Sequence, residues 1–334
     1  MKSRRVLVLS HEDLMAPESL EGLTDQQIHD TKCERDVVNT LRELGHEVRQ
    51  LGVSDDLRPI RSAIVRWKPH VVFNLLEEFL DTALFDHNVV AYLELLRASY
   101  TGCGPRGLVL TRDKSLANKL MAYHRVKGPR FFVVRRGLKP RMKRGLKFPM
   151  IVKALNEEAS LAIAKASIVH SEEKLAERVK FVHEHAETHA LVEEFIEGRE
   201  VYVAMIGNQR LQVLPPQELV VGNLAEGERL IATAKLKHDP NYQKKRQVKV
   251  VTAELTPEQH KVLERASRRA YRVLELKGYA RIDYRLAEDG SFYFLEANPN
   301  PELAKGEEVA DAAAAAGITY PELIQKIVSL GMRH

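Results

Sequence analysis

The chain is poor in cysteine and contains no long hydrophobic run. Among its 334 residues the only cysteines are Cys33 and Cys103, and two such residues provide neither a disulfide framework nor the spacing of a metal site. No apolar stretch approaches the roughly 20 residues of a membrane-spanning helix, and the apolar residues 6–9 are too few for a signal-peptide core. We therefore expect a cytoplasmic protein with reduced thiols and no membrane partner.

The chain also lacks a strong charge imbalance. Its net charge of +5 arises from 51 Lys and Arg against 46 Asp and Glu, which does not by itself favour a nucleic-acid partner. Basic residues cluster at positions 135–147 and 244–246, and the first cluster contains no aromatic side chain that would stack on bases. An exposed linker and an anion-binding patch both remain open for this cluster, and we expect no nucleic-acid partner.

The length and the 44% of hydrophobic residues allow two or three domains. In the first part of the chain, short apolar runs alternate with amphipathic stretches, a pattern typical of an α/β fold with parallel strands. Strands are expected at residues 6–9, 46–52 and 71–76, and helices at residues 30–44 and 89–97.

From residue 111 onward the pattern is typical of mixed antiparallel sheet and helix. Helices are expected from residue 111 and at 171–185, and strands at 131–134, 148–154 and 190–196. Thr256, Pro257 and Gln259 predict a capping box that begins a further helix. The residues of that helix expected to face inward are Val262, Ala266, Ala270, Val273 and Leu274.

Near the C-terminus, Asp289 and Gly290 separate two runs rich in aromatic and branched residues, which predicts a β-hairpin with a two-residue turn. In that register Asp283 lies opposite Glu296 and Arg281 lies opposite Asn298, all on one face of the ladder. The other face is expected to carry Ile282, Tyr284, Leu295 and Ala297.

The paired carboxylates of this hairpin predict a metal site. Opposed carboxylates repel each other unless a positive charge lies between them. Asp283, Glu296 and the Asn298 amide offer the hard oxygen ligands that suit Mg²⁺, and Arg281 can hold an anion beside the ion. The alternative is a solvated polar face of an edge hairpin, in which the acids pair with Arg281 and Arg285.

Four motifs occur in an order that resembles the ATP-grasp enzymes, and within them the D-alanine-D-alanine ligase branch. They are residues 100–104 with Asp113 and Lys114 downstream, residues 151–153, residues 191–196 followed by Gly198 and Glu200, and residues 281–283 followed by 295–298. The resemblance implies an α/β protein of ATP-grasp fold that joins a carboxylate to an amine. It implies an N-terminal parallel α/β domain at 1–110 and two α+β domains, 111–195 and 196–334, that clasp ATP.

The resemblance also assigns expected roles to individual residues. Lys114 and Lys153 resemble the ammonium groups that hold the ATP phosphates, with Ser160 in the loop that covers them. Glu193 and the backbones of Glu194 and Ile196 would contact adenine, and Glu200 would bind the ribose.

On the catalytic side, Asp283, Glu296 and Asn298 resemble the magnesium ligands, for two ions that Mn²⁺ can replace. Arg281 resembles the arginine that steadies the transferred phosphoryl group, and Lys235 resembles the lysine of the lid loop.

The chain departs from these ligases where their substrates bind. The phosphate-covering loop, residues 156–162, keeps a serine but has no glycine. Acidic residues replace the amino-acid pocket motifs of the ligases, so D-alanine is not the expected substrate; they are Glu77, Glu78, Glu302, Glu307 and Glu308. They can receive an amine-bearing group, and exposed surface glutamates without a ligand remain the alternative. His11 and Glu12, which follow the first strand, are candidates for orienting the amine or shuttling its proton.

These observations predict an ATP- and Mg²⁺-dependent ligase that forms an acyl phosphate and joins it to an amine. The expected substrates are small molecules or peptides, such as amino acids, other than D-alanine. A non-catalytic ATP-binding regulator and a small-molecule phosphotransferase remain alternatives. The sequence leaves the oligomeric state open, a homodimer included.

Overall fold

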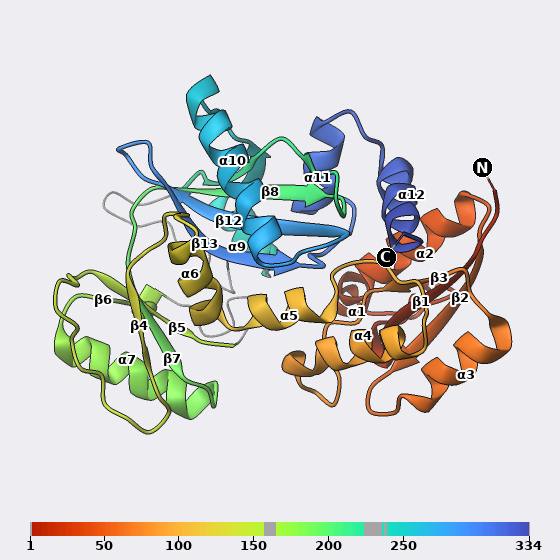
Figure 1. The fold of residues 1–334 in the computed structure, drawn as a ribbon, viewed down its shortest axis with the longest axis horizontal. Coiled ribbons are helices and arrows are strands. Elements are labelled where there is room, and N and C mark those ends of the chain that lie inside the picture. The colour runs from red at the N-terminus through yellow and green to blue at the C-terminus, as the bar shows by residue number, and fades with distance from the viewer. Residues whose placement is uncertain (1, 157–164, 224–235, 237–238, 334) are drawn as a thin grey trace.

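Figure 1 shows the computed structural model, in which residues 2–156, 165–223, 236 and 239–333 are described. Its strands form three sheets that succeed one another along the chain. The first sheet, red to orange in Figure 1, and the second, yellow to green, lie at opposite ends of the molecule. The third sheet, mostly blue, lies between and above them in this view.

The first sheet is parallel, as predicted. It consists of β1 (Arg5–His11), β2 (Glu47–Val53) and β3 (Val71–Asn74), in the order β2-β1-β3. Alternate side chains of β1 join two different hydrophobic clusters, because both faces of this sheet are covered by other elements.

The helix predicted at residues 30–44 corresponds to α2 (Lys32–Glu43). A separate short helix that was not predicted, α1 (Asp25–Asp30), precedes it and begins at a capping box on Thr24. The remaining helical elements of this region are η1 (Glu12–Leu14), α3 (Arg58–Trp67), η2 (Ala83–Phe85) and α4 (Asp86–Leu95).

The second sheet is antiparallel, again as predicted. Its strands are β4 (Phe131–Val134), β5 (Met150–Ala154), β6 (Ile168–Val169) and β7 (Ala190–Glu194), in the order β4-β7-β5-β6. The short helix η3 (Lys165–Ser167) precedes β6, and α7 (Glu172–His185) packs on the sheet through Leu175, Val179 and Val182. The basic cluster at 135–147 is largely exposed and connects β4 with β5.

The third sheet carries the predicted metal hairpin. The order β11-β10-β8-β12-β13 places β12 inside the sheet, and β9 pairs with β8. The strands are β8 (Arg199–Ile206), β9 (Gln212–Val213), β10 (Gln217–Val221), β11 (Val248–Thr252), β12 (Tyr279–Leu286) and β13 (Phe292–Pro299). The helices of this region are α9 (Pro240–Arg246), α10 (Pro257–Val273) and α11 (Glu308–Ala315).

Helix α10 begins at the predicted capping box on Thr256, and of the residues predicted to face inward Ala270 and Leu274 are buried, whereas the prediction for Val262 is wrong. Val262 is 46% exposed, and Ala266 and Val273 are half-buried. The buried positions are Leu263, Ser267, Ala270, Tyr271 and Leu274. Hydrogen bonds select this face, because the hydroxyls of Ser267 and Tyr271 reach buried partners on the sheet side.

The β12–β13 hairpin has the predicted pairs but not the predicted turn. Asp283 lies opposite Glu296 and Arg281 opposite Asn298. The loop contains three residues, with Gly290 at φ +77°, which is a common hairpin geometry. A bulge between Asp283 and Tyr284 then shifts the pairing by one residue, so that Asp283 and Glu296 are paired as predicted. As a result Phe294, rather than Leu295, lies opposite Tyr284 in the core.

Two helical connections link the sheets. The helix predicted from residue 111 is interrupted at Asp113, whose side chain caps α6 (Lys114–Tyr123) after α5 (Pro105–Arg112) has ended. At the end of the chain, α12 (Tyr320–Gly331) returns to the first sheet beside α2, as Figure 1 shows. Hydrophobic side chains of α12 thereby complete the core around β1 and β3.

Candidate active site

A cavity of about 380 Å³ lies beside the β12–β13 hairpin. Arg281, Glu296 and Asn298 line it from the hairpin, and Tyr202 lines it from β8. The opposite side is formed by the segment between β13 and α11 and by residues of the first sheet region. Three of the four hairpin residues predicted to carry the chemistry therefore line one cavity, whereas Asp283 is not among its lining residues.

Asp283 is 1% exposed and is held by its neighbours on the same face. Arg281 donates to both carboxylate oxygens of Asp283, at 2.8 and 3.0 Å, and its third nitrogen donates to Glu308 at 3.0 Å. The Asn298 amide donates to Asp283 at 3.1 Å. Burial lowers the pKa of Arg281, but the surrounding carboxylates outweigh it and raise the pKa well above its ordinary value.

These contacts agree in part with the alternative of a simple polar face. Asp283 is paired with Arg281, but β12 is an interior strand, and Arg285 pairs with Glu200. The residues still fit a divalent cation. Each carboxylate oxygen has two lone pairs, so Asp283 can accept from Arg281 and also ligate an ion, and Glu296 lies directly across the ladder.

The two predicted phosphate-binding lysines both lie near carboxylates of the same region. Lys153 on β5 pairs with Glu193 on β7 at 2.8 Å, and Asn118 of α6 donates to the other oxygen of Glu193. Burial lowers the pKa of Lys153, but Glu193, Glu296 and Glu200 raise it above its ordinary value overall. Lys114 lies 4.0 Å from Glu296. Both lysines thus interact with Glu296 of the hairpin.

The remaining residues predicted to contact the nucleotide lie at the end of β7, just beyond it and on β8. Glu194 pairs with Arg130, and Ile196 is half-buried just beyond the strand. Glu200 on β8 is buried and accepts from Arg285 at 2.9 Å and from the Tyr202 hydroxyl at 3.1 Å. Ser160 and Lys235, the two other predicted residues, lie outside the described part of the chain.

Glu12 is placed away from this group. It is exposed at the start of η1, and it is not among the described residues that line the cavity. His11 instead lies with Glu78 and Asp81, and the candidate ligand atoms of these three residues are all within 4.8 Å of one another. Glu78 therefore belongs to a different cluster from Glu77, which lines the cavity.

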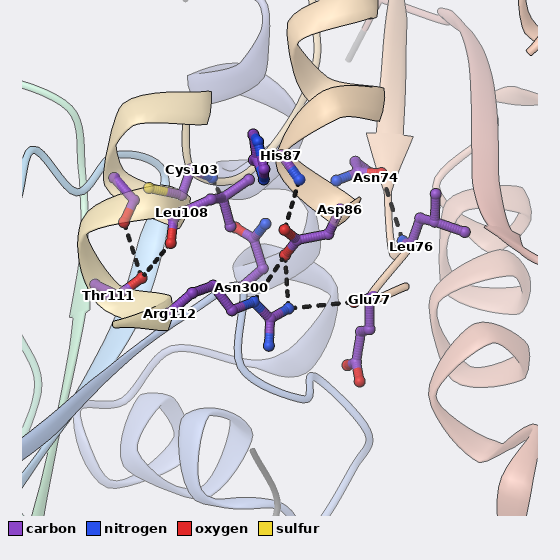
Figure 2. Close-up of polar contacts among 11 residues, drawn as sticks. Asn74, Leu76, Glu77, Asp86, His87, Cys103, Leu108, Thr111, Arg112 and Asn300 are labelled. Carbon is purple, nitrogen blue, oxygen red and sulfur yellow. Dashed lines mark hydrogen bonds and ion pairs between the residues drawn. The ribbon is translucent and has the colours of Figure 1, made fainter. Parts of the chain in front are cut away.

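Sequence reasoning missed a buried ion pair on the cavity wall. Arg112 donates to Asp86 at 2.6 and 3.2 Å and to the backbone carbonyl of Glu77 at 3.2 Å, as Figure 2 shows. Both side chains are at least 94% buried. No spacing in the sequence connects α4 with the end of α5, so only the folded chain reveals that this pair fixes the position of Glu77.

Asn300 is a second residue that the sequence did not single out. Its side-chain oxygen accepts from the Cys103 backbone at 2.7 Å, also drawn in Figure 2. A side chain at Gly102, which has φ +91°, would collide with this amide. The repeated Asn-Pro at 298–301 was the available signal. Asn300 ties the end of the metal hairpin to the loop that precedes α5.

Comparisons with known proteins place these features in a family context. The family model described as D-ala D-ala ligase C-terminus matches residues 116–329. The protein y4sG of Sinorhizobium fredii, named there as uncharacterized, is 32% identical over 305 residues, covering 89% of this chain and 86% of y4sG. A D-alanine–D-alanine ligase of Pelotomaculum thermopropionicum is 27% identical and covers 79% of this chain and 84% of its own length.

Solved structures agree with the fold. The crystal structure of D-alanine–D-alanine ligase from Bacillus anthracis aligns with a TM-score of 0.77 at 19% identity, over 99% of this chain and 98% of the ligase. The same enzyme complexed with ATP aligns with a TM-score of 0.74. The predicted ATP-grasp fold is confirmed. None of the described helices has the length and hydropathy needed to cross a membrane.

Proposed function

The chain belongs to the family of the D-ala D-ala ligase C-terminus, and on that premise we propose that it is an ADP-forming ligase that joins a carboxylate to an amine. The observation that carries this proposal is the cavity beside the hairpin, onto which Arg281, Glu296 and Asn298 face. We further propose that the substrates are amino acids or peptides other than D-alanine, because the cavity is lined by the acidic residues that distinguish this sequence.

The proposed reaction has two steps. A carboxylate oxygen of the first substrate attacks the γ-phosphorus of ATP, and the bond to the bridging oxygen breaks, so that ADP leaves. The amine nitrogen then attacks the acyl carbon of the resulting acyl phosphate, the bond from that carbon to the phosphate oxygen breaks, and the nitrogen loses a proton. The products are an amide, ADP and inorganic phosphate.

Each group of residues has a part in these steps. Lys114 and Lys153 hold the phosphates by charge, while Glu193, Glu194, Ile196 and Glu200 bind the adenosine part. Arg281 stabilises the negative charge that develops on the transferred phosphoryl group. Asp283, Glu296 and Asn298 would hold Mg²⁺, which supplies neutralisation of phosphate charge. Since ATP is available in the cytoplasm, we place the reaction there.

The proposal is tested by ADP release from the full-length protein with ATP, Mg²⁺ and pools of amino acids and dipeptides, with mass spectrometry of the products. We expect slow release with ATP alone and a marked rise only when both a carboxylate and an amine are present. ATP binding without any amide product would favour the non-catalytic regulator. A phosphorylated small molecule that forms without an amine would favour the phosphotransferase.

A further inference from the structure

The active-site cavity continues into a second cavity of about 200 Å³. Six residues line both of them: His29, Leu76, Glu77, Asn300, Pro301 and Glu302. The second cavity extends to α2, where it is lined by Cys33 and Glu34. A substrate that reacts beside the hairpin can therefore extend toward α2 along this shared wall.

The two cavities together are strongly acidic. Nine aspartate and glutamate side chains line them, against the three Lys and Arg side chains Arg112, Lys249 and Arg281 and one histidine, His29. Two of the three Lys and Arg side chains are already bound to acids, since Arg112 pairs with Asp86 and Arg281 with Asp283 and Glu308. Lys32 pairs with Glu307 at 3.8 Å. The lining as a whole favours a cation.

The surroundings of Glu34 are the clearest indication that a positively charged ligand binds in these cavities. Its side chain lines the second cavity and the residue is only 4% exposed. Among the described residues, its carboxylate accepts a hydrogen bond only from its own backbone. Burial, together with Glu77 and Glu302, raises its pKa to about 8. A buried carboxylate without a cationic partner is costly, and a ligand ammonium would remove that cost.

We propose that the amine substrate carries a second positive charge, as a diamine or a basic amino acid does, and that Glu34 and Glu302 hold that charge. The inference rests on the proposed ligase function and names its substrate class. The reacting amine is the uncharged end, which attacks the acyl phosphate and loses a proton to become the amide nitrogen. The distant ammonium keeps its protons and remains between the two carboxylates.

Binding is measured first, by calorimetry on the full-length protein with Mg²⁺ and a non-hydrolysable ATP analogue. The probes are 1,4-diaminobutane and lysine, compared with butylamine and norleucine, which lack the second charge. We expect the charged probes to bind at least about tenfold more tightly, the value of one charge-assisted contact. Tighter binding of lysine indicates a basic amino acid, and tighter binding of 1,4-diaminobutane indicates a simple diamine. Equal or weaker binding of both charged probes would overturn the inference.

Variants then locate the charge. Glu34→Gln and Glu302→Gln should each weaken binding of the charged probe about tenfold and leave the uncharged probes unaffected. Glu43→Gln, an exposed change on the same helix as Glu34, is the matched control. Binding should also release a proton, because an ammonium lowers the pKa of Glu34, and this release should disappear in Glu34→Gln. Unchanged binding in both cavity variants would contradict the proposed position.

Measurements of turnover distinguish a failure of this inference from a failure of the proposed ligase function. If amides form with uncharged amines as readily as with charged ones, the ligase stands and the second charge is wrong. If charged probes bind with the stated preference but no amide forms with any acid, the cation site stands and the ligase is wrong.

Discussion

At the scale of single residues, Asp283 and Glu296 differ in burial and in their contacts, although they lie opposite each other on β12 and β13. Asp283 is buried and takes part in a network with Arg281 and Asn298. The side chain of Glu296 is 28% exposed and lies 4.0 Å from Lys114. Replacing Asp283 would leave the buried Arg281 with Glu308 alone, so its removal lowers stability as well as activity. Glu296 is the better position for testing metal binding.

Glu296→Gln should lower the rate of ADP release at least about 100-fold, because it removes a charged oxygen ligand of the proposed Mg²⁺ ion that neutralises the reacting phosphates. The unfolding midpoint in urea should change little, since the side chain is 28% exposed and its ion pair with Lys114 is long, at 4.0 Å. Glu288→Gln, in the exposed loop of the same hairpin, should behave as wild type in both measurements. Near-normal turnover in Glu296→Gln would remove this residue from the metal site.

Glu34 also predicts a dependence of stability on pH. Its pKa is about 8 in the folded chain against an ordinary value of 4.5, so the folded state binds the proton more tightly. The associated stability is present below pH 4.5 and is lost as the pH rises through 8. The free energy of unfolding should therefore fall between pH 5 and 8 by at least about 1 kcal/mol more in the wild type than in Glu34→Gln.

Urea denaturation across that pH range provides the measurement. Burial and nearby acids raise the pKa of Glu307 to about 7, so Glu307 also lowers the free energy of unfolding as the pH rises. The measurement therefore compares the free energy of unfolding of the wild type with that of Glu34→Gln at each pH. The Glu43→Gln control should keep the wild-type slope. Parallel curves for wild type and Glu34→Gln would show that Glu34 ionises normally.

At the scale of elements, α10 shows how the start of an amphipathic helix can be predicted correctly while a residue at the edge of its inward face, Val262, is predicted wrongly. The capping box on Thr256 determines where it begins, because backbone donors at a helix start need local partners. Its orientation depends on the surface that it covers. Both Val262 and Leu263 are apolar, and contact with the third sheet buries Leu263 instead of Val262.

Leu263→Ala should lower the free energy of unfolding by about 2 to 5 kcal/mol, because it leaves a cavity in the main core. Val262→Ala, one residue earlier on the same helix, should change it by less than about 0.5 kcal/mol. Chemical denaturation of the two variants decides between the faces. A larger loss for Val262→Ala would support the orientation predicted from periodicity.

At the scale of the whole molecule, α12 connects the two ends of the chain. Leu323, Ile324, Ile327 and Val328 are fully buried in a cluster that also contains Val6 and Phe73 of the first sheet. We retain the division at residues 110 and 195 as a proposal for three domains. The first of them would then depend on a helix from the last segment for part of its core.

Ile327→Ala should therefore destabilise the first sheet by about 2 to 5 kcal/mol, although the two segments are far apart in sequence. Hydrogen exchange should rise in β1 and β3, which the helix covers. Leu95→Ala, at a position that is 80% exposed, serves as the control and should leave exchange unchanged. A loss of protection confined to α12 would mean that the first sheet is stable without it.

The sequence by itself determined what depends on local order. The parallel first sheet, the antiparallel second sheet and the opposition of Asp283 to Glu296 follow from strand periodicity, caps and turn residues, whose physics acts over a few positions. The predicted hairpin lacked both the third loop residue and the bulge. These two features shift the strand pairing in opposite directions, so the predicted pair Asp283 and Glu296 is still correct.

Only the tertiary structure decided which distant residues meet. The pairing of Arg112 with Asp86, the contact of Asn300 with Cys103 and the convergence of Glu34 with Glu302 join separate elements. Their positions depend on how helices and sheets pack, which is set by the fit of many side chains at once. Short motifs therefore predicted the type of fold and the proposed chemistry, whereas the acidic lining of the two cavities depends on packing.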